Sequence, residues 1–200
     1  MLLVKPAAGG AAAFEIEAQG ANGHSCSLDG DIRDGRATLA TPTGTCVVTF
    51  AAVPEGIRVG SVAPGPCRDF CGARATFEQM YLRPAPGCAP SKVKAQRDTF
   101  KRRYDARQFA EARDVLAPML ERCARTLGFF EIEWVRNDLA LTLHRLKDDA
   151  GCRQVLTPLA ALAKETDADI RERFPPTDAE SMLAIAQATR TNLKLCAAGK

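Results

Sequence analysis

The residues of this sequence with the clearest capacity for chemistry are its eight cysteines. Their number is even, and only Cys67 and Cys71 lie within four residues of each other. Scattered thiols of this kind serve as cross-links in an oxidising compartment, whereas a cytosolic enzyme has little use for them. We therefore expect an exported, disulfide-bonded protein, and the alternative is a cytosolic protein with eight reduced thiols. The expected disulfide residues are Cys26, Cys46, Cys67, Cys71, Cys88, Cys123, Cys152 and Cys196.

Four pairs follow from where these cysteines fall in the expected secondary structure. Cys26 and Cys46 fall on neighbouring strands, and a bond between them would stabilise the fold by about 3 kcal/mol. One turn of helix would bring Cys67 and Cys71 onto one face, where a local disulfide is geometrically possible. In the second half of the chain, Cys152 and Cys196 fall on two helices, and a Cys88–Cys123 bond would join the linker to a helix. The expected pairs are Cys26–Cys46, Cys67–Cys71, Cys152–Cys196 and Cys88–Cys123.

A zinc site is the competing interpretation of Cys67 and Cys71. It requires two more ligands, and the only candidates are Cys88 and His24, at irregular spacing. Three residues separate Cys67 from Cys71, so the pair is not the redox motif Cys-x-x-Cys. We expect neither a metal nor another cofactor.

Catalytic groups other than cysteine are scarce. The two histidines, His24 and His144, cannot be combined with other residues into a Ser-His-Asp triad. Glu131 and Glu133 lie just before Trp134, but alternate residues of a helix do not face each other. The sequence contains no His-Glu-x-x-His motif, no phosphate-binding loop motif and no Gly-x-Gly-x-x-Gly motif. We therefore expect that the protein is not an enzyme.

Composition and charge are ordinary for a globular chain. Of 200 residues, 46% are hydrophobic and 26% are charged. The 27 Lys and Arg residues are interleaved with 24 Asp and Glu residues, and the net charge of +3 does not favour nucleic acid as a partner. No apolar run approaches about 18 residues, so no membrane span is expected. The segment 1–6 lacks the charged region and apolar core of a signal peptide, so we expect the sequence to begin after a removed signal.

Two sequence patterns divide the chain near residue 90 and predict the fold class α+β. Residues 14–83 contain five or six short strands joined by Gly, Pro and Asp turns, which is typical of a small antiparallel barrel or sandwich. Residues 1–13 are expected to form a flexible tail, 84–91 a proline-rich linker and 92–200 a helical domain. The expected strands are 14–18, 25–32, 36–40, 45–50 and 57–62, with strand-like alternation again at 73–77.

The helical half contains an internal repeat. Residues 112–120 align with residues 152–160, forty positions later. Each segment follows a short turn, at 106–108 and at 147–149. A repeat of this length is typical of stacked helical hairpins. The expected helices are 92–106, 108–126, 131–147, 149–165 and 178–196.

Residues 137–152 resemble a unit of the tetratricopeptide repeat (TPR) family, with Leu139, Ala140 and Leu143 at the packing positions of the first helix. The resemblance implies an all-α TPR-like domain whose first helices line a concave protein-binding face. It also implies which residues face that groove. These candidate partner-binding residues are Asn137, Leu141 and His144, with Trp134 one turn earlier. The alternative for Trp134 is packing against Phe129 or Phe130.

The stretch Cys67–Phe77 reads Cys-x-x-x-Cys-Gly-Ala-Arg-Ala-x-Phe and follows Cys26 and a strand with Cys46. This order resembles the small β domains of Gram-negative periplasmic proteins described as lysozyme-inhibitor-like. The resemblance covers residues 14–82 and implies a periplasmic protein that binds proteins or cell-wall enzymes.

Two functions from different classes remain. The first is a periplasmic protein that neutralises a cell-wall-degrading enzyme, as a lysozyme inhibitor or as an immunity protein against a secreted toxin. Such a protein would insert Arg68, Asp69 or Arg74 into a carboxylate-lined cleft, where a guanidinium can pair bidentately; surface ion pairs are the alternative role of both arginines. The second is a non-enzymatic envelope scaffold or assembly factor whose repeats hold a protein partner.

Overall fold

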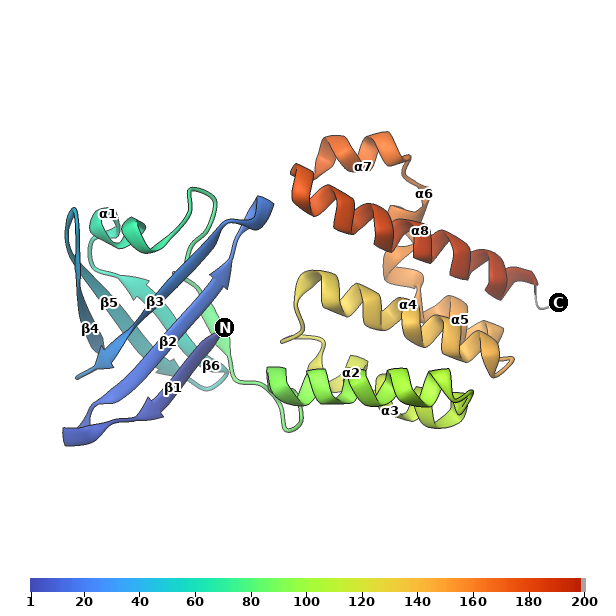
Figure 1. The fold of residues 1–200 in the computed structure, drawn as a ribbon, viewed down its shortest axis with the longest axis horizontal. Helices are drawn as coiled ribbons and strands as arrows, with labels where there is room; N and C mark the ends of the chain where they lie inside the picture. Colours follow the sequence, from blue (N-terminus) through green and yellow to red (C-terminus); the bar gives the residue numbers. More distant parts are fainter. Residues whose placement is uncertain (199–200) are drawn as a thin grey trace. The chain divides into compact units, whose positions relative to one another are not determined.

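The structure, a computed structural model, describes residues 1–198 and has an α+β fold. The chain divides into two compact units between Arg83 and Pro84. The first unit contains all of the strands, and the second contains helices α2 to α8 (Figure 1). Within residues 1–198 no helix is long and apolar enough to cross a membrane.

Seven strands form two antiparallel sheets in the first unit. One sheet has the order β1-β2-β3 and the other has the order β4-β5-β6-β7. These strand orders leave both sheets open, so the barrel that was one of the expected forms is not observed. The strands are β1 (Leu2–Pro6), β2 (Ala12–Gln19), β3 (Ser25–Ile32), β4 (Arg36–Thr41), β5 (Gly44–Val53), β6 (Gly56–Ser61) and β7 (Met80–Leu82).

Alternation of apolar and polar residues explains the core of this unit. In β2 every second residue is buried, and Ile16 pairs with Leu28 of β3 in the antiparallel register. Val48 of β5 and Val59 of β6 belong to the same hydrophobic core, so the two sheets share it. A strand places alternate side chains on opposite faces, and this sequence assigns the apolar set to the core side.

Two expectations for the β unit are wrong. Residues 2–6 are not part of a flexible tail, because they form β1 and pair with β2, with Leu2 opposite Ile16. Residues 73–77 are not a strand; the strand that pairs with β6 is Met80–Leu82 instead. Phe77 is nevertheless buried in the core, which accounts for the apolar position at that point of the sequence.

In the second unit α2, α3, α4 and α5 pack in succession, and α8 packs against α4, α5, α6 and α7 (Figure 1). The helices α2, α3, α4 and α8 correspond to expected helices, with bounds that differ by one to three residues. The elements are α2 (Pro90–Asp105), α3 (Phe109–Cys123), α4 (Phe129–Arg145), α5 (Asp149–Val155), the 3-10 turn η4 (Thr157–Leu159), α6 (Ala160–Lys164), α7 (Asp167–Arg173) and α8 (Pro176–Ala198).

The single helix expected at 149–165 is divided into α5, η4 and α6. Pro158 lies in the interrupting turn, where a proline removes a backbone donor and crowds the preceding turn. Its repeat counterpart, Pro118, lies inside α3, which continues through it. The helix α7 was not expected, and its start is fixed by Thr166, whose hydroxyl accepts a hydrogen bond from the backbone N–H of Asp169.

The forty-residue repeat is preserved in the packing. Ala112 and Cys152 are both fully buried, and so are Leu116 and Leu156. Ala112 and Leu116 lie on α3, whereas Cys152 lies on α5 and Leu156 directly follows it. The helices α3 and α5 are the second helices of two successive hairpins. The repeat in the sequence therefore reflects the same inward-facing positions used twice.

Candidate functional site

The four disulfides of the structure agree with the sequence analysis in the helical unit and differ from it in the β unit. Cys26 lies on β3 and Cys46 on β5, which belong to different sheets, so they do not meet. Cys71 instead forms an isolated bridge with Cys26, and α1 (Pro64–Cys67) packs against β5. The expected pairs Cys26–Cys46 and Cys67–Cys71 are therefore wrong. The observed pairs are Cys26–Cys71, Cys46–Cys67, Cys88–Cys123 and Cys152–Cys196.

These bonds also exclude the zinc alternative. Cys67, Cys71 and Cys88 are each bonded to another cysteine, so none can supply a thiolate to a metal. His24 is left without any of its proposed co-ligands. Across residues 1–198 no group of three or more His, Cys, Asp or Glu residues is arranged to hold a metal ion.

Three segments of the β unit meet in what we call the loop cluster, residues 20–24, 41–44 and 64–75. The backbone N–H of Gly72 donates a 2.8 Å hydrogen bond to the carbonyl of Ser25. A Cβ atom on Gly72 would lie 2.6 Å from Nδ1 of His24, and a Cβ on Gly20 would overlap the carbonyl oxygen of Arg74. Both positions therefore need glycine for the 20–24 turn to approach the third segment.

Asp69 joins the third segment to the turn between β4 and β5. Its Oδ2 accepts hydrogen bonds from the backbone N–H of Thr43 at 3.1 Å and from the Thr43 hydroxyl at 2.8 Å. The hydroxyl bond is the main cause that holds the pKa of the Asp69 carboxyl below its usual value. Of the three candidate residues here, Asp69 is thus used to fix the loop cluster internally.

Arg68 and Arg74 are the other two candidates on the loop cluster, and both are exposed. Neither guanidinium forms an ion pair or a hydrogen bond with any of residues 1–198. The alternative role as surface ion pairs is therefore wrong for both. The segment 67–74, which carries both, is bonded through Cys67 to β5 and through Cys71 to β3, so both side chains project from an anchored backbone.

Asn137 does not lie on an open groove, and its expected partner-binding role is wrong. Its exposed fraction is 2%, and it lies between α4 and α8. Its Nδ2 donates to the Thr189 hydroxyl at 3.1 Å, and its Oδ1 accepts from Nδ2 of Asn192 at 3.0 Å. Asn137 is therefore the centre of a buried polar network, and such networks fix how two elements pack.

Trp134 and His144 are also engaged within the helical unit. Trp134 is half-buried against the hydrophobic core that includes Leu183 and Ile185 of α8. His144 is half-buried, and its Nδ1 lies 2.8 Å from Oδ1 of Asp149 at the start of α5. Both side chains mainly serve packing and the connection between helices, in contrast to the exposed positions expected for them.

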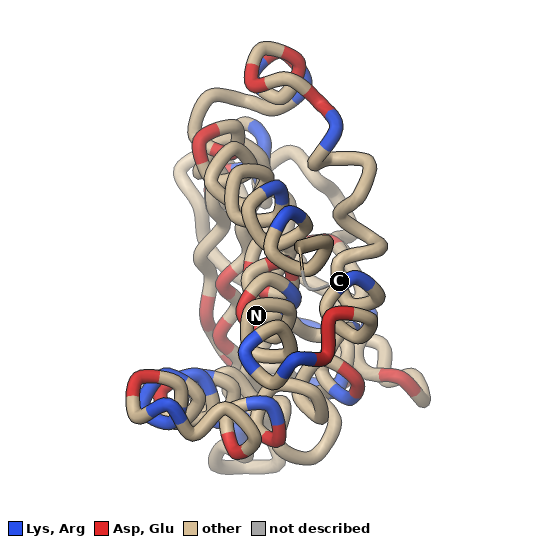
Figure 2. Tube along the Cα trace, turned by 90° about the vertical axis from the view of Figure 1, so that its right-hand side faces the viewer, with Lys and Arg blue, Asp and Glu red and all other residues tan. Residues whose placement is uncertain are grey.

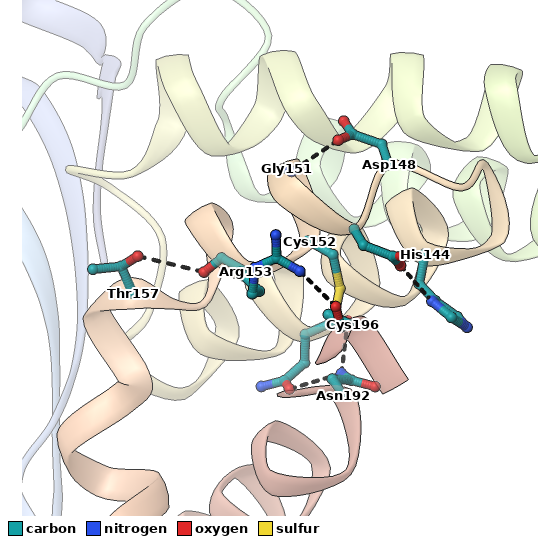
Figure 3. The surroundings of a disulfide bond; sticks show 10 residues. His144, Asp148, Gly151, Cys152, Arg153, Thr157, Asn192 and Cys196 are labelled. Atoms are coloured by element: carbon teal, nitrogen blue, oxygen red, sulfur yellow. Dashed lines mark hydrogen bonds and ion pairs between the residues drawn. A yellow bond between two sulfur atoms is a disulfide. The ribbon is translucent and has the colours of Figure 1, made fainter. Parts of the chain in front are cut away.

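The Cys152–Cys196 disulfide joins α5 to α8 (Figure 3). Nη1 of Arg153 donates a 2.6 Å hydrogen bond to the carbonyl of Cys196, which reinforces the same junction. Asp148 caps α5 by accepting from the backbone N–H of Gly151 at 2.8 Å. Cys152 and Cys196 are fully buried, so this disulfide stabilises the packing of α5 against α8.

Leu141, another helical candidate, lines a cavity. The cavity, of about 410 Å³, lies between α2 and α4. In its wall, Nη1 of Arg97 lies 2.7 Å from Oδ2 of Asp138. Burial raises the pKa of the Asp138 carboxyl, although the positive charge of Arg97 acts to lower it. Sequence analysis missed the other residues of this cavity because they lie on two helices, and no local sequence pattern shows that these two helices pack together. The lining residues are Arg97, Asp98, Phe100, Lys101, Tyr104, Asp105, Asp138 and Leu141.

Many charges on the helices are paired within their own helix. Basic and acidic positions are interspersed along the chain (Figure 2), and several pairs are close, as Lys94 with Asp98 and Lys101 with Asp105, each at 2.8 Å. Exposed pairs of this kind contribute little to stability and leave little net field.

Comparisons with known proteins found no similar protein. No protein-family model matches the chain, and no curated protein or solved structure matches it either. The function therefore has to be inferred from the geometry of the two units.

Proposed function

We propose that this protein is an exported, non-enzymatic binding protein that neutralises a cell-wall-degrading enzyme through the loop cluster. The observation that carries the proposal is the presentation of Arg68 and Arg74, two unpaired exposed guanidiniums on a segment held by two disulfides. Asp69 adds a third constraint through Thr43. The proposed partner is a peptidoglycan hydrolase or a secreted effector.

The chemistry of such a partner fits this surface. Glycoside hydrolases place two carboxyl groups about 5–9.5 Å apart in an open cleft. A guanidinium offers five N–H donors in a planar fork that pairs bidentately with a carboxylate. Because the disulfides already fix the backbone of the loop cluster, little backbone entropy would be lost when Arg68 or Arg74 enters the cleft, and the remaining cost is the ordering of their side chains.

The compartment is part of the same proposal. Four disulfides are consistent with export to an oxidising environment. The periplasm is the compartment that the resemblance of Cys67–Phe77 to lysozyme-inhibitor-like domains favours. A TPR-like character of the helical unit is compatible with protein binding, and it is favoured by the burial of Ala112 and Cys152, the equivalent positions of the forty-residue repeat.

The second candidate is an envelope scaffold or assembly factor. It is favoured by one observation, the cavity between α2 and α4 that is lined by Tyr104, Leu141 and the Arg97–Asp138 pair. Grooves between helical repeats commonly hold a protein partner.

Direct mixing experiments test the first candidate. The protein is mixed with purified muramidases, amidases and peptidases, and both hydrolysis and complex formation are measured. We expect inhibition of one class, and we expect Arg68→Ala with Arg74→Ala to weaken the complex by at least about 2 kcal/mol. Arg58→Ala, an exposed arginine of β6 outside the loop cluster, is the matched control and should bind as the wild type does.

Two results would contradict the proposal in different ways. Absence of binding and inhibition for every hydrolase would remove the neutralising function. Normal inhibition by the Arg68→Ala, Arg74→Ala double variant would keep the function but move the interface away from the loop cluster.

A further inference from the structure

A second cavity of the helical unit, also about 410 Å³, lies where α2 and α4 end. It is separate from the loop cluster, and none of its residues was a candidate in the sequence. Volumes of this order are typical of ligand pockets. Its lining residues are Tyr104, Asp105, Arg107, Phe109 and Arg145.

Both arginines of this cavity have free N–H donors. Arg107 and Arg145 are exposed, and neither guanidinium makes a hydrogen bond or an ion pair with any of residues 1–198. The one acidic lining residue, Asp105, is already paired with Lys101 at 2.8 Å. The cavity therefore carries two positive charges whose hydrogen-bonding capacity is unused.

Helix capping does not account for Arg107. Its φ angle of 59° lies in the left-handed region, at the position after a helix where glycine is usual. A side chain in this conformation is strained, and no hydrogen bond from the guanidinium to the last carbonyls of α2 offsets that strain. Attraction to the negative end of the helix stabilises the charge but leaves its donors free.

An aromatic wall lies beside these charges. The rings of Tyr104 and Phe109 are half-buried, with centroids 5.2 Å apart in an edge-to-face arrangement. Aromatic surface favours contact with an aromatic or apolar side chain. A pair of guanidiniums favours a carboxylate, which each fork can bind with two parallel hydrogen bonds.

We propose that this cavity binds a carboxylate group of a polypeptide together with an adjacent aromatic side chain. Arg107 and Arg145 hold the carboxylate, and Tyr104 and Phe109 contact the ring. The carboxylate comes either from a Glu or Asp side chain next to the aromatic residue or from a C-terminal aromatic residue. This site lies in the helical unit and goes beyond the proposed function of the loop cluster.

Two matched pairs of peptides test the proposal on the full chain by isothermal titration calorimetry at low salt. The first pair is acetyl-Ser-Gly-Glu-Phe-Gly-amide and the same peptide with Gln in place of Glu. The second pair is acetyl-Ser-Gly-Gly-Phe with a free C-terminus and its C-terminal amide. We expect the carboxylate member of at least one pair to bind at least about tenfold more tightly than its neutral counterpart. The pair that shows this difference identifies the source of the carboxylate.

Variants of the two arginines place the binding in this cavity. Arg107→Gly removes the guanidinium and also relieves the left-handed backbone, so loss of binding in that variant cannot be attributed to unfolding. We expect Arg107→Gly and Arg145→Gln each to weaken peptide binding about tenfold. The control is Arg125→Gln, an exposed arginine after α3 that lines no part of the cavity, and it should leave binding unchanged.

The proposal is overturned if all four peptides bind equally or not at all, or if the Arg107 and Arg145 variants bind as Arg125→Gln does. The Arg68→Ala, Arg74→Ala variant should bind these peptides normally, so failure here and failure of the loop-cluster interface give different results.

Discussion

Arg107 and Lys147 occupy the same position of two successive helical hairpins, forty residues apart, and both have left-handed backbone, with φ of 59° and 65°. In each case the N–H of the next residue donates back to a carbonyl in the last turn of the helix, which is the hydrogen-bond pattern of a glycine-type helix end. The two bonds are Gln108 N–H to the Arg103 carbonyl and Asp148 N–H to the Leu143 carbonyl, both 2.9 Å. The repeat thus extends from side chains to backbone conformation.

This geometry predicts an order of stability for substitutions at both turns. Glycine accepts a positive φ without strain, whereas alanine keeps the strain of about 1–2 kcal/mol, and the greater entropy of unfolded glycine offsets about 0.4–1 kcal/mol of it. Arg107→Gly should therefore be more stable than Arg107→Ala by about 1 kcal/mol, and Lys147→Gly should exceed Lys147→Ala similarly. Comparing alanine with glycine cancels the loss of charge. Urea unfolding measures the difference, and equal stability of the two variants would contradict the assigned turn.

Peptide mapping without reductant tests the disulfides of the β unit. Trypsin cleaves after Arg68 and so separates Cys67 from Cys71. The expected linked peptides contain Cys26 with Cys71 and Cys46 with Cys67. A peptide that links Cys26 to Cys46 would contradict the structure.

Removal of these bonds should destabilise the β unit according to the length of chain that each one closes. The Cys26–Cys71 bond has a sequence separation of 45 and the Cys46–Cys67 bond one of 21. The chain-entropy relation gives a loss of about 4 kcal/mol for Cys26→Ala with Cys71→Ala, and about 3.3 kcal/mol for Cys46→Ala with Cys67→Ala. Thermal unfolding of both variants beside the wild type measures the two losses, and the unfolding of the helical unit should stay unchanged.

The buried network at Asn137 can be tested on α8 with a control on the same helix. Thr189→Val keeps the side-chain shape but removes the hydroxyl that accepts from Nδ2 of Asn137, so a buried donor loses a partner. We expect a loss of about 1–3 kcal/mol. Thr191 makes the same type of bond to the carbonyl four residues earlier but is exposed, so Thr191→Val should change stability by less than about 0.5 kcal/mol. Equal effects in chemical denaturation would show that Asn137 does not depend on Thr189.

The raised pKa of the Asp138 carboxyl predicts how the stability of the protein depends on pH. Burial raises its pKa in the folded protein, so the folded state binds more protons than the unfolded state between the unfolded pKa, about 3.9, and the higher folded value. The contribution of Asp138 to stability therefore falls as the pH rises through this window. The stability of the wild type relative to Asp138→Asn should be greater at pH 4 than at pH 7, as urea titrations at several pH values would show. A relative stability that rises with pH would mean that the attraction of Arg97 outweighs burial.

Local patterns in the sequence determined much of the fold. The alternation around Ile16 predicted a half-buried strand, and Asp34-Gly35 predicted the turn before β4, where both residues have positive φ. The repeat predicted that Ala112 and Cys152 pack equivalently. Each of these features depends on residues within one strand, one turn or one helix face, so it can be read without knowing which elements meet.

Apart from the two disulfides of the helical unit, only the tertiary structure decided which elements meet. The partners of Cys26 and Cys46 depend on the assignment of β3 and β5 to separate sheets. The burial of Asn137 depends on α8, more than fifty residues away, and a helical periodicity does not say which polar residue will find a partner there. The cavity of Arg107 and Arg145 likewise joins the ends of two helices. Such contacts are set by the packing of whole elements, because burial on one face constrains the type of residue but not its partner.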